Sequence, residues 1–183
     1  MLENTILAEL TCDASQGALR FKGVRYLLIR PETLASLQAS LEAEIGPERA
    51  GEILYGSGFT GGQLSGRKYK DIFGLSDRQA VEFMCRMGAE IGWGHFHLVE
   101  LNVTARHLAV EVAASPFAQY YNSETEAGVC HLIRGVLGGL GSAVFGTAVQ
   151  AREVRCLALG NELCRFEVLA LAADKDIRRS PPV

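Results

Sequence analysis

The sequence predicts an α+β domain in which an antiparallel sheet is covered by helices on one face. Apolar residues alternate in pairs of short segments in the second half of the chain, and they recur at helical spacing between those pairs. The βαβ alternation that marks a parallel sheet does not occur. A chain of 183 residues is also long enough to bury a full core as one domain.

The first third of the chain predicts a hairpin followed by two helices. Residues 18–30 are rich in aromatic and β-branched residues around a turn-like Lys-Gly pair. Pro31 and Pro47 each stand where a proline opens a helix. The second helix passes into a glycine-rich stretch, residues 56–70, for which we expect a mobile segment beside a pocket.

The middle of the chain predicts a third helix and a strand pair. Ser76 and Gln79 are spaced as a capping box ahead of an apolar helical stripe. After Gly92 the apolar period becomes alternating, so residues 95–103 and 106–114 predict two antiparallel strands.

The last third predicts one helix and a final strand pair. Ser123 and Glu126 suggest another capping box, starting a helix that runs to about Gly146. Glycines inside this helix cost about 0.8–1 kcal/mol each relative to alanine, so we expect either close approach of a second helix or room for a ligand. Strands at roughly 148–158 and 163–170 would turn at a Gly-Asn pair.

These elements give three parts: an N-terminal extension over residues 1–17, a ligand-binding domain over residues 18–170, and a tail over residues 171–183. The tail is charged and contains Pro-Pro, so we expect it to be disordered.

Charge and hydropathy argue against nucleic acid and membrane partners. The formal net charge is −3, and there is no run of Lys and Arg. The longest uncharged stretch, residues 135–151, is shorter than the ~20 residues that cross a bilayer. Glu3 and Glu9 stand where a signal peptide would carry positive charge, so we expect a cytoplasmic protein.

Three cysteines and one glutamate near the C-terminus form the most distinctive pattern. Cys130, Glu153, Cys156 and Cys164 would supply three thiolates and one carboxylate, a set suited to tetrahedral Zn²⁺. Glu153 and Cys156 point to opposite faces of a regular strand, so sharing an ion requires a bulge or twist. Spacing alone leaves open a metal site, a cluster of reduced thiols and a disulfide.

The segment EVRCLALGNELCRFEV, residues 153–168, resembles the C-terminal signature of the 4-vinyl reductase domain family, approximately E-x-K-C-x-x-x-G-(D/N)-x-x-C-x-F. Cys130 stands where that family has its first cysteine, and residues 23–34 resemble its early segment. The resemblance covers about residues 18–170. It implies an α+β fold shared with subunits of the TRAPP vesicle-transport complex, and a homodimer.

The same resemblance implies a sensory role. In phenol- and xylene-responsive activators of this family, the domain binds an aromatic effector in a buried pocket. Three cysteines and a glutamate hold zinc near that pocket, which implies Zn²⁺ on Cys130, Glu153, Cys156 and Cys164. A closed four-ligand set leaves no position for a substrate water, so the metal would be structural or coupled to a switch.

Aromatic and histidine side chains in the middle of the chain are candidates for the ligand pocket. Trp93 and His95 open a predicted strand, and Phe117 and Tyr120 lie in a polar, aromatic loop. Any of them could instead pack as an ordinary core or surface residue.

The sequence therefore predicts a zinc-containing module that binds a small hydrophobic or aromatic ligand and acts through a separate partner protein. Two alternatives remain: a vinyl reductase or pigment-delivery factor of bacteriochlorophyll synthesis, and a structural assembly subunit. A reductase needs a hydride source. The G-x-G-x-x-G match at residues 56–61 lacks the preceding strand of a dinucleotide site, so we favour a binding module over an enzyme.

Overall fold

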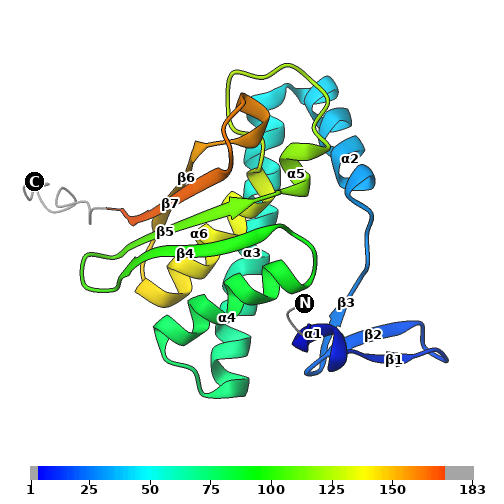
Figure 1. Ribbon diagram of the computed structural model, residues 1–183, viewed down its shortest axis with the longest axis vertical. Coiled ribbons are helices and arrows are strands. Elements are labelled where there is room, and N and C mark those ends of the chain that lie inside the picture. Colours follow the sequence, from blue (N-terminus) through cyan, green and yellow to red (C-terminus); the bar gives the residue numbers. More distant parts are fainter. Residues whose placement is uncertain (1–3, 172–183) are drawn as a thin grey trace, which may run out of the picture.

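A computed structural model describes residues 4–171. The centre of the fold is a four-stranded antiparallel sheet, with strand order β4-β5-β7-β6, whose inner face is covered by helices (Figure 1). The predicted α+β fold, with helices packed on one face of an antiparallel sheet, is confirmed. The helices are α1 (Thr5–Ala8), α2 (Pro31–Ile45), α3 (Pro47–Phe73), α4 (Asp77–Glu90), α5 (Pro116–Gln119) and α6 (His131–Phe145).

The large sheet contains both predicted strand pairs. Its strands are β4 (His95–Asn102), β5 (His107–Ala113), β6 (Val149–Arg155) and β7 (Cys164–Ala170). The last pair needs one correction, because the expected strand over residues 148–158 ends at Arg155 and a short 3-10 helix, η1 (Leu157–Leu159), follows. The chain turns there because the backbone N–H of Leu157 donates to the Cys164 thiol, and that of Leu159 donates to the Cys156 carbonyl.

Helices α3 and α6 make the most extensive contact between elements of the described chain. A Cβ atom added at Gly58 or Gly62 of α3 would overlap the backbone of α6, and one added at Gly135 or Gly139 of α6 would overlap the backbone of α3. The glycines therefore serve close approach of two helices. The expectation of a mobile segment over residues 56–70 is wrong: α3 is continuous there, and Gly58, Gly62 and Gly66 are packed against α6.

Helix α6 begins later than predicted. Its first residue is His131 and its N-cap is Cys130, whereas Ser123 and Glu126 lie in an irregular segment. Tertiary partners explain the difference. Just ahead of the helix, the backbone N–H of Cys130 donates to Glu153 and the Val129 carbonyl accepts from Gln38. These bonds hold the segment outside the helix.

The N-terminal region is a separate small sheet beside the lower end of α4 (Figure 1). It contains β1 (Thr11–Asp13), β2 (Ala18–Phe21) and β3 (Val24–Tyr26), in that order. The hairpin predicted in residues 18–30 is present, and residues 4–17 of the predicted extension form α1 and β1. An apolar cluster joins the region to the rest of the chain: Ile6, Phe21, Tyr69, Phe83 and Met87.

Of the predicted tail, Leu171 alone is described, and residues 172–183 lie outside the described part of the chain. Within residues 4–171, no helix combines the length and the apolar character needed to cross a membrane.

Candidate metal centre and ligand cavities

The structure brings together the four residues predicted as metal ligands. One ligand atom from each of Cys130, Glu153, Cys156 and Cys164 lies within 4.8 Å of the other three. The residues come from different places in the fold: the N-cap of α6, the strand β6, the β6–η1 junction and the start of β7. All three thiols are fully buried.

A bulge in β6 aims Glu153 at the cluster. Glu153 pairs with Phe166 and Arg155 pairs with Arg165, so the register shifts at Val154. The extra residue reverses the side on which the following side chain lies, and Glu153 and Cys156 can then share one face. The three-residue spacing of Glu153 and Cys156 predicted a bulge or twist in this strand, and the structure contains the bulge.

The carboxylate of Glu153 is only half satisfied by the protein. Its Oε2 accepts the backbone N–H of Cys130 at 2.9 Å, while its Oε1 is buried without a hydrogen-bond partner in the described chain. Burial, followed by the negative charge of Cys156, raises the pKa of Glu153 to about 8. An orphaned buried oxygen beside three sulfurs fits a metal ligand, because a divalent cation would supply the missing partner.

The thiols have the spacing of zinc ligands. Cys130 Sγ and Cys164 Sγ are 3.6 Å apart, close to the ~3.8 Å expected across a tetrahedral ion with Zn–S bonds of about 2.3 Å. All five cysteines of the chain are free, so the disulfide alternative is not supported. Hydrogen bonds from Cys130 and then Cys164 lower the pKa of Cys156, which makes it the first thiolate of the cluster.

Neighbouring groups orient the cysteines. The Ser115 hydroxyl lies 3.4 Å from Cys130 Sγ, and the Leu157 N–H donates to Cys164 Sγ at 3.4 Å. The Asn161 side chain donates to the carbonyl of Cys156 at 3.0 Å. Such outer contacts fix the ligand geometry of metal sites. The donor set and its surroundings therefore fit Zn²⁺ held in a closed structural site.

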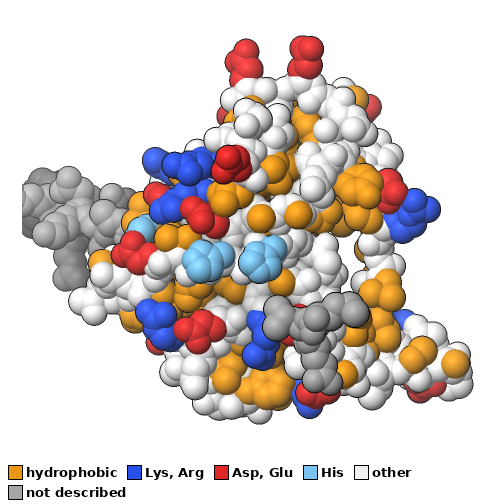
Figure 2. Space-filling model, viewed as in Figure 1, with side chains coloured by type: hydrophobic (Ala, Val, Ile, Leu, Met, Phe, Trp, Pro, Cys, Tyr) orange, Lys and Arg blue, Asp and Glu red, His pale blue; other side chains and the backbone are white. Residues whose placement is uncertain are grey.

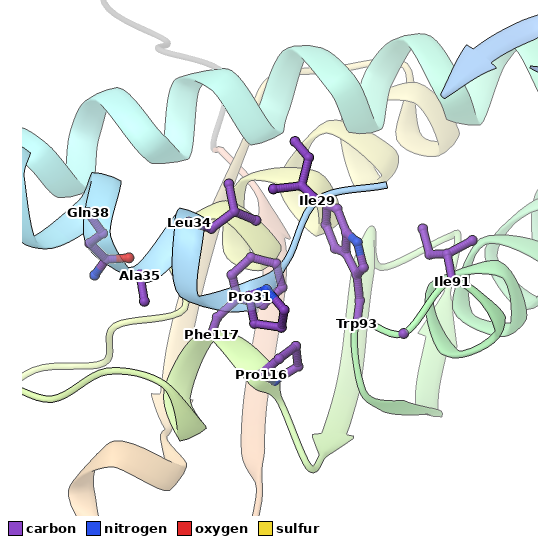
Figure 3. A pocket seen from close by; sticks show the side chains of 10 residues that line it. Ile29, Pro31, Leu34, Ala35, Gln38, Ile91, Trp93, Pro116 and Phe117 are labelled. Carbon is purple, nitrogen blue, oxygen red and sulfur yellow. The ribbon is translucent and has the colours of Figure 1, made fainter. Parts of the chain in front are cut away.

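Two of the four predicted pocket residues line a cavity. Trp93 and Phe117 meet edge to face, with ring centroids 5.2 Å apart, in a small cavity of about 70 Å³ at the start of α2 (Figure 3). Neither His95 nor Tyr120 lines this cavity or the two other cavities that Trp93 lines. His95 is exposed because strand alternation turns Phe96 inward instead, and Tyr120 is 39% exposed where α5 ends.

A second cavity, of about 160 Å³, lies between the helices and β4 and is called here the inner cavity. Its walls come from Tyr26, α3, α4, the α4–β4 turn, β4 and α6: Tyr26, Gly61, Ser65, Met84, Cys85, Met87, Gly88, Ile91, Trp93, Phe96, Val136, Leu137 and Leu140.

A third space, of about 510 Å³, is the outer groove between the N-terminal region, residues 27–29 and the end of α4. Trp93 and Ile91 line all three spaces, so the predicted Trp93 is central to them. We did not predict from the sequence that Val136, Leu137 and Leu140 of α6 line a cavity. The glycine-rich, apolar sequence of that helix was the signal that could have indicated it.

Comparisons with known proteins agree with this architecture. The chain has a TRAPP-like fold that carries a Cys/Glu cluster and an apolar inner cavity. The chain belongs to the family described as activator of aromatic catabolism, whose family model matches residues 6–103, more than half of the chain. The model of the 4-vinyl reductase domain matches residues 108–170, which confirms the resemblance to that family. No curated protein matches the chain.

Solved structures share the fold. The phenol-responsive sensory domain of the transcription activator PoxR, crystallised with phenol, has a TM-score of 0.80 at 22% identity, covering 90% of this chain and 86% of that one. A vinyl-4-reductase family protein from Methanocaldococcus jannaschii has a TM-score of 0.52 at 15% identity, over 76% and 78% of the two chains. A trafficking protein particle complex subunit 3 from Naegleria fowleri has a TM-score of 0.52 at 14% identity, over 78% and 95%.

Proposed function

We propose that this chain is a zinc-containing sensory module that binds a small hydrophobic or aromatic ligand and passes the binding event to a partner protein. One observation carries the proposal: α6 is capped by Cys130 of the metal cluster, and two turns later the same helix lines the inner cavity with Val136, Leu137 and Leu140. Ligand site and metal site therefore share one helix.

Membership of the aromatic-catabolism activator family supports an aromatic ligand, and the phenol-responsive domain of PoxR has the same fold. Bound zinc would compensate the negative charge of Glu153 and the thiolates. The cluster joins the start of α6 to β6 and β7. A ligand in the inner cavity would contact the middle of the same helix, at Val136, Leu137 and Leu140.

We also propose that the chain forms a homodimer, because it exposes apolar surface that a second copy could cover. Leu27, Leu28 and Leu37 are each more than half exposed, and they lie in and just after the segment that links the N-terminal region to α2. The orange patch along this linker is visible in Figure 2. Apolar surface of this kind marks interaction sites. We place the module in the cytoplasm, where thiol ligands stay reduced.

Two alternatives are less well supported. A nucleotide-dependent vinyl reductase would need a phosphate-binding loop, but residues 56–61 lie within α3, and Gly58 is packed against the α6 backbone. A purely structural subunit would have a filled core, whereas the inner cavity leaves about 160 Å³ between the helices. We also propose residues 18–170 as the ligand-binding domain.

Native mass spectrometry of the full chain tests the proposal. We expect one zinc ion per chain in a dimer, and a rise in melting temperature when an aromatic ligand is added in excess. Metal-free protein whose melting temperature responds to no aromatic ligand up to the solubility limit would contradict the sensory function. A zinc-loaded protein that ignores every ligand would favour the structural subunit.

A further inference from the structure

The Glu153 carboxylate lies in a cradle of backbone formed by residues 128–130. The N–H of Cys130 donates to its Oε2 at 2.9 Å. A Cβ atom added at Gly128 would lie 2.5 Å from the same oxygen and 2.7 Å from the carboxyl carbon. Non-bonded carbon atoms normally stay about 3.5–4.0 Å apart, so a side chain at position 128 does not fit beside the carboxylate where it now lies.

The backbone conformation does not require a glycine at this position. Gly128 lies outside the left-handed region of φ, unlike Gly146 and Gly160, which end α6 and η1 with positive φ. Alanine can therefore adopt the conformation of Gly128, and the glycine serves the close approach of Glu153 rather than a turn.

The segment that forms the cradle is also held from α2. Gln38 donates to the carbonyl of Val129 at 3.3 Å, and both Val129 and Cys130 are buried. The Glu153 carboxylate, in contrast, stands at the end of a side chain with several rotatable bonds. A methyl group at position 128 would therefore displace the carboxylate more easily than the segment.

Displacement of the carboxylate would remove one of the four candidate ligands. The Oε1 atom of Glu153 is the oxygen that lacks a hydrogen-bond partner in the described chain. Without it, the thiols of Cys130, Cys156 and Cys164 would remain. Three protein ligands with an open fourth position are the arrangement of catalytic zinc sites, whereas four protein ligands close a structural site.

We infer that Gly128 is a positioning residue of the metal centre: the absence of a side chain there lets Glu153 take the fourth ligand position and excludes water and other small ligands from the ion. This inference rests on the zinc site of the proposed function and names the residue that keeps that site closed. Gly128 itself supplies no ligand.

Cobalt substitution in the full chain tests the inference, because Co²⁺ binds the same kinds of ligand as Zn²⁺ and its visible absorption reports the ligand set. Imidazole, a ligand suited to such ions, is the probe for an open position. We expect the wild-type spectrum to be unchanged by imidazole. In Gly128→Ala, imidazole should change the spectrum, and the affinity for zinc should fall roughly 10–100-fold. Gly56→Ala, where an added Cβ atom meets open space, is the matched control and should behave as the wild type.

A double variant shows whether Gly128 acts through Glu153. The three heavy atoms nearest to a Cβ atom at position 128 all belong to the Glu153 side chain, and Glu153→Ala removes them. That variant should respond to imidazole as Gly128→Ala does. Adding Gly128→Ala to it should lower the zinc affinity and the melting temperature no further, because the methyl group has nothing left to displace.

This comparison also applies if Gly128→Ala alone folds poorly, since the double variant should then fold as well as Glu153→Ala. A further loss of zinc affinity or stability in the double variant would mean that the methyl group disturbs the segment itself. That result would overturn the positioning role.

The remaining outcomes separate the positioning role from the proposed metal site. If the wild type binds both ions and Gly128→Ala keeps the same spectrum, zinc affinity and indifference to imidazole, the positioning role is overturned and the metal site stands. A wild-type spectrum that responds to imidazole would likewise overturn the inference, because Glu153 would not close the site. A wild-type chain that binds neither ion would overturn the metal site and the positioning role together.

Discussion

The body of the fold, residues 31–171, and the N-terminal region, residues 4–26, are held in place by different kinds of contact. In the body, α3 and α6 touch backbone to backbone, and a buried Cys/Glu cluster joins α6 to β6 and β7. The N-terminal region is attached through an aromatic cluster and through hydrogen bonds to the end of α4. Its linker leaves Leu28 80% exposed. The inner cavity lies where the two regions meet, with Tyr26 from one and Leu137 from the other in its wall.

This difference separates rigidity from adaptability. Backbone contacts and metal ligands tolerate almost no displacement, whereas aromatic side chains and single hydrogen bonds can rearrange at modest cost. We therefore expect a displacement of the N-terminal region to cost less free energy than a displacement of α3 against α6.

The largest effect is expected from the metal cluster. Cys156→Ser should release the zinc ion that we propose for this cluster and lower the melting temperature strongly, because it leaves Glu153 and two thiols buried without a compensating cation. Metal content and thermal unfolding measure this. Cys12→Ser, at an exposed position, is the matched control and should change neither. Equal stability of the two variants would show that the cluster is only a group of thiols.

The next effect tests the backbone contact in the body. Gly139→Ala places a methyl group against the Phe59 carbonyl, so α3 and α6 must separate, at a cost of roughly 3 kcal/mol or more in the free energy of unfolding. Denaturant unfolding measures it. Gly61→Ala, on α3 with open space at its Cβ position, should instead stabilise the fold by about 0.5–1 kcal/mol. If both changes were neutral, the helices would not be in close contact.

A smaller effect is expected where the N-terminal region is attached. Glu90→Ala removes the carboxylate that accepts the Ile6 N–H at 2.6 Å and the Thr5 hydroxyl at 3.0 Å, at a cost of about 1–3 kcal/mol. Hydrogen exchange should accelerate in residues 4–10 and stay slow in α6. Glu82→Ala, an exposed partner of Arg78 on the same helix, should have little effect. Acceleration throughout the chain would mean that the two regions unfold as one unit.

The smallest effect concerns α2, which follows the linker from the N-terminal region and packs against α3 and α5. Gln38 is buried and donates to the Val129 carbonyl, next to Cys130. Gln38→Ala should cost about 1 kcal/mol and accelerate exchange in the segment before α6. Ser40→Ala, on the exposed side of α2, is the control. Slow exchange in that segment despite the change would show that α2 does not support the metal cluster.

The predicted elements succeeded where the local pattern and the tertiary contacts agree. The strand pair around β4 and β5 and the capping box at Ser76 are of this kind. The prediction failed at Ser123 and Glu126, whose spacing fits a capping box, because Gln38 donates to the Val129 carbonyl and Glu153 accepts the Cys130 N–H, which holds the following segment outside the helix. It also failed in residues 56–70, where Gly58, Gly62 and Gly66 belong to a pattern that suggests a flexible segment but are packed against α6.

The candidate site also contains residues that the sequence predicted and residues that only the tertiary structure brings together. The residue types and spacing of Cys130, Glu153, Cys156 and Cys164 were readable in the sequence, and so was the need for a bulge. Of the residues predicted for the ligand pocket, Trp93 and Phe117 line a cavity, and their role in ligand binding stays a prediction. The deep wall of the inner cavity was not found, because it is assembled from α3, α4, β4 and α6, which lie far apart along the chain.

The sequence by itself determined the fold class, the order of the strand pairs and the four candidate ligands, because these follow from local periodicity and from the chemistry of single side chains. Tertiary structure decided where α6 begins, that α3 continues through its glycine-rich stretch, and which residues enclose the cavity. Each of these depends on which backbone groups meet across the fold, and a linear pattern does not contain that information.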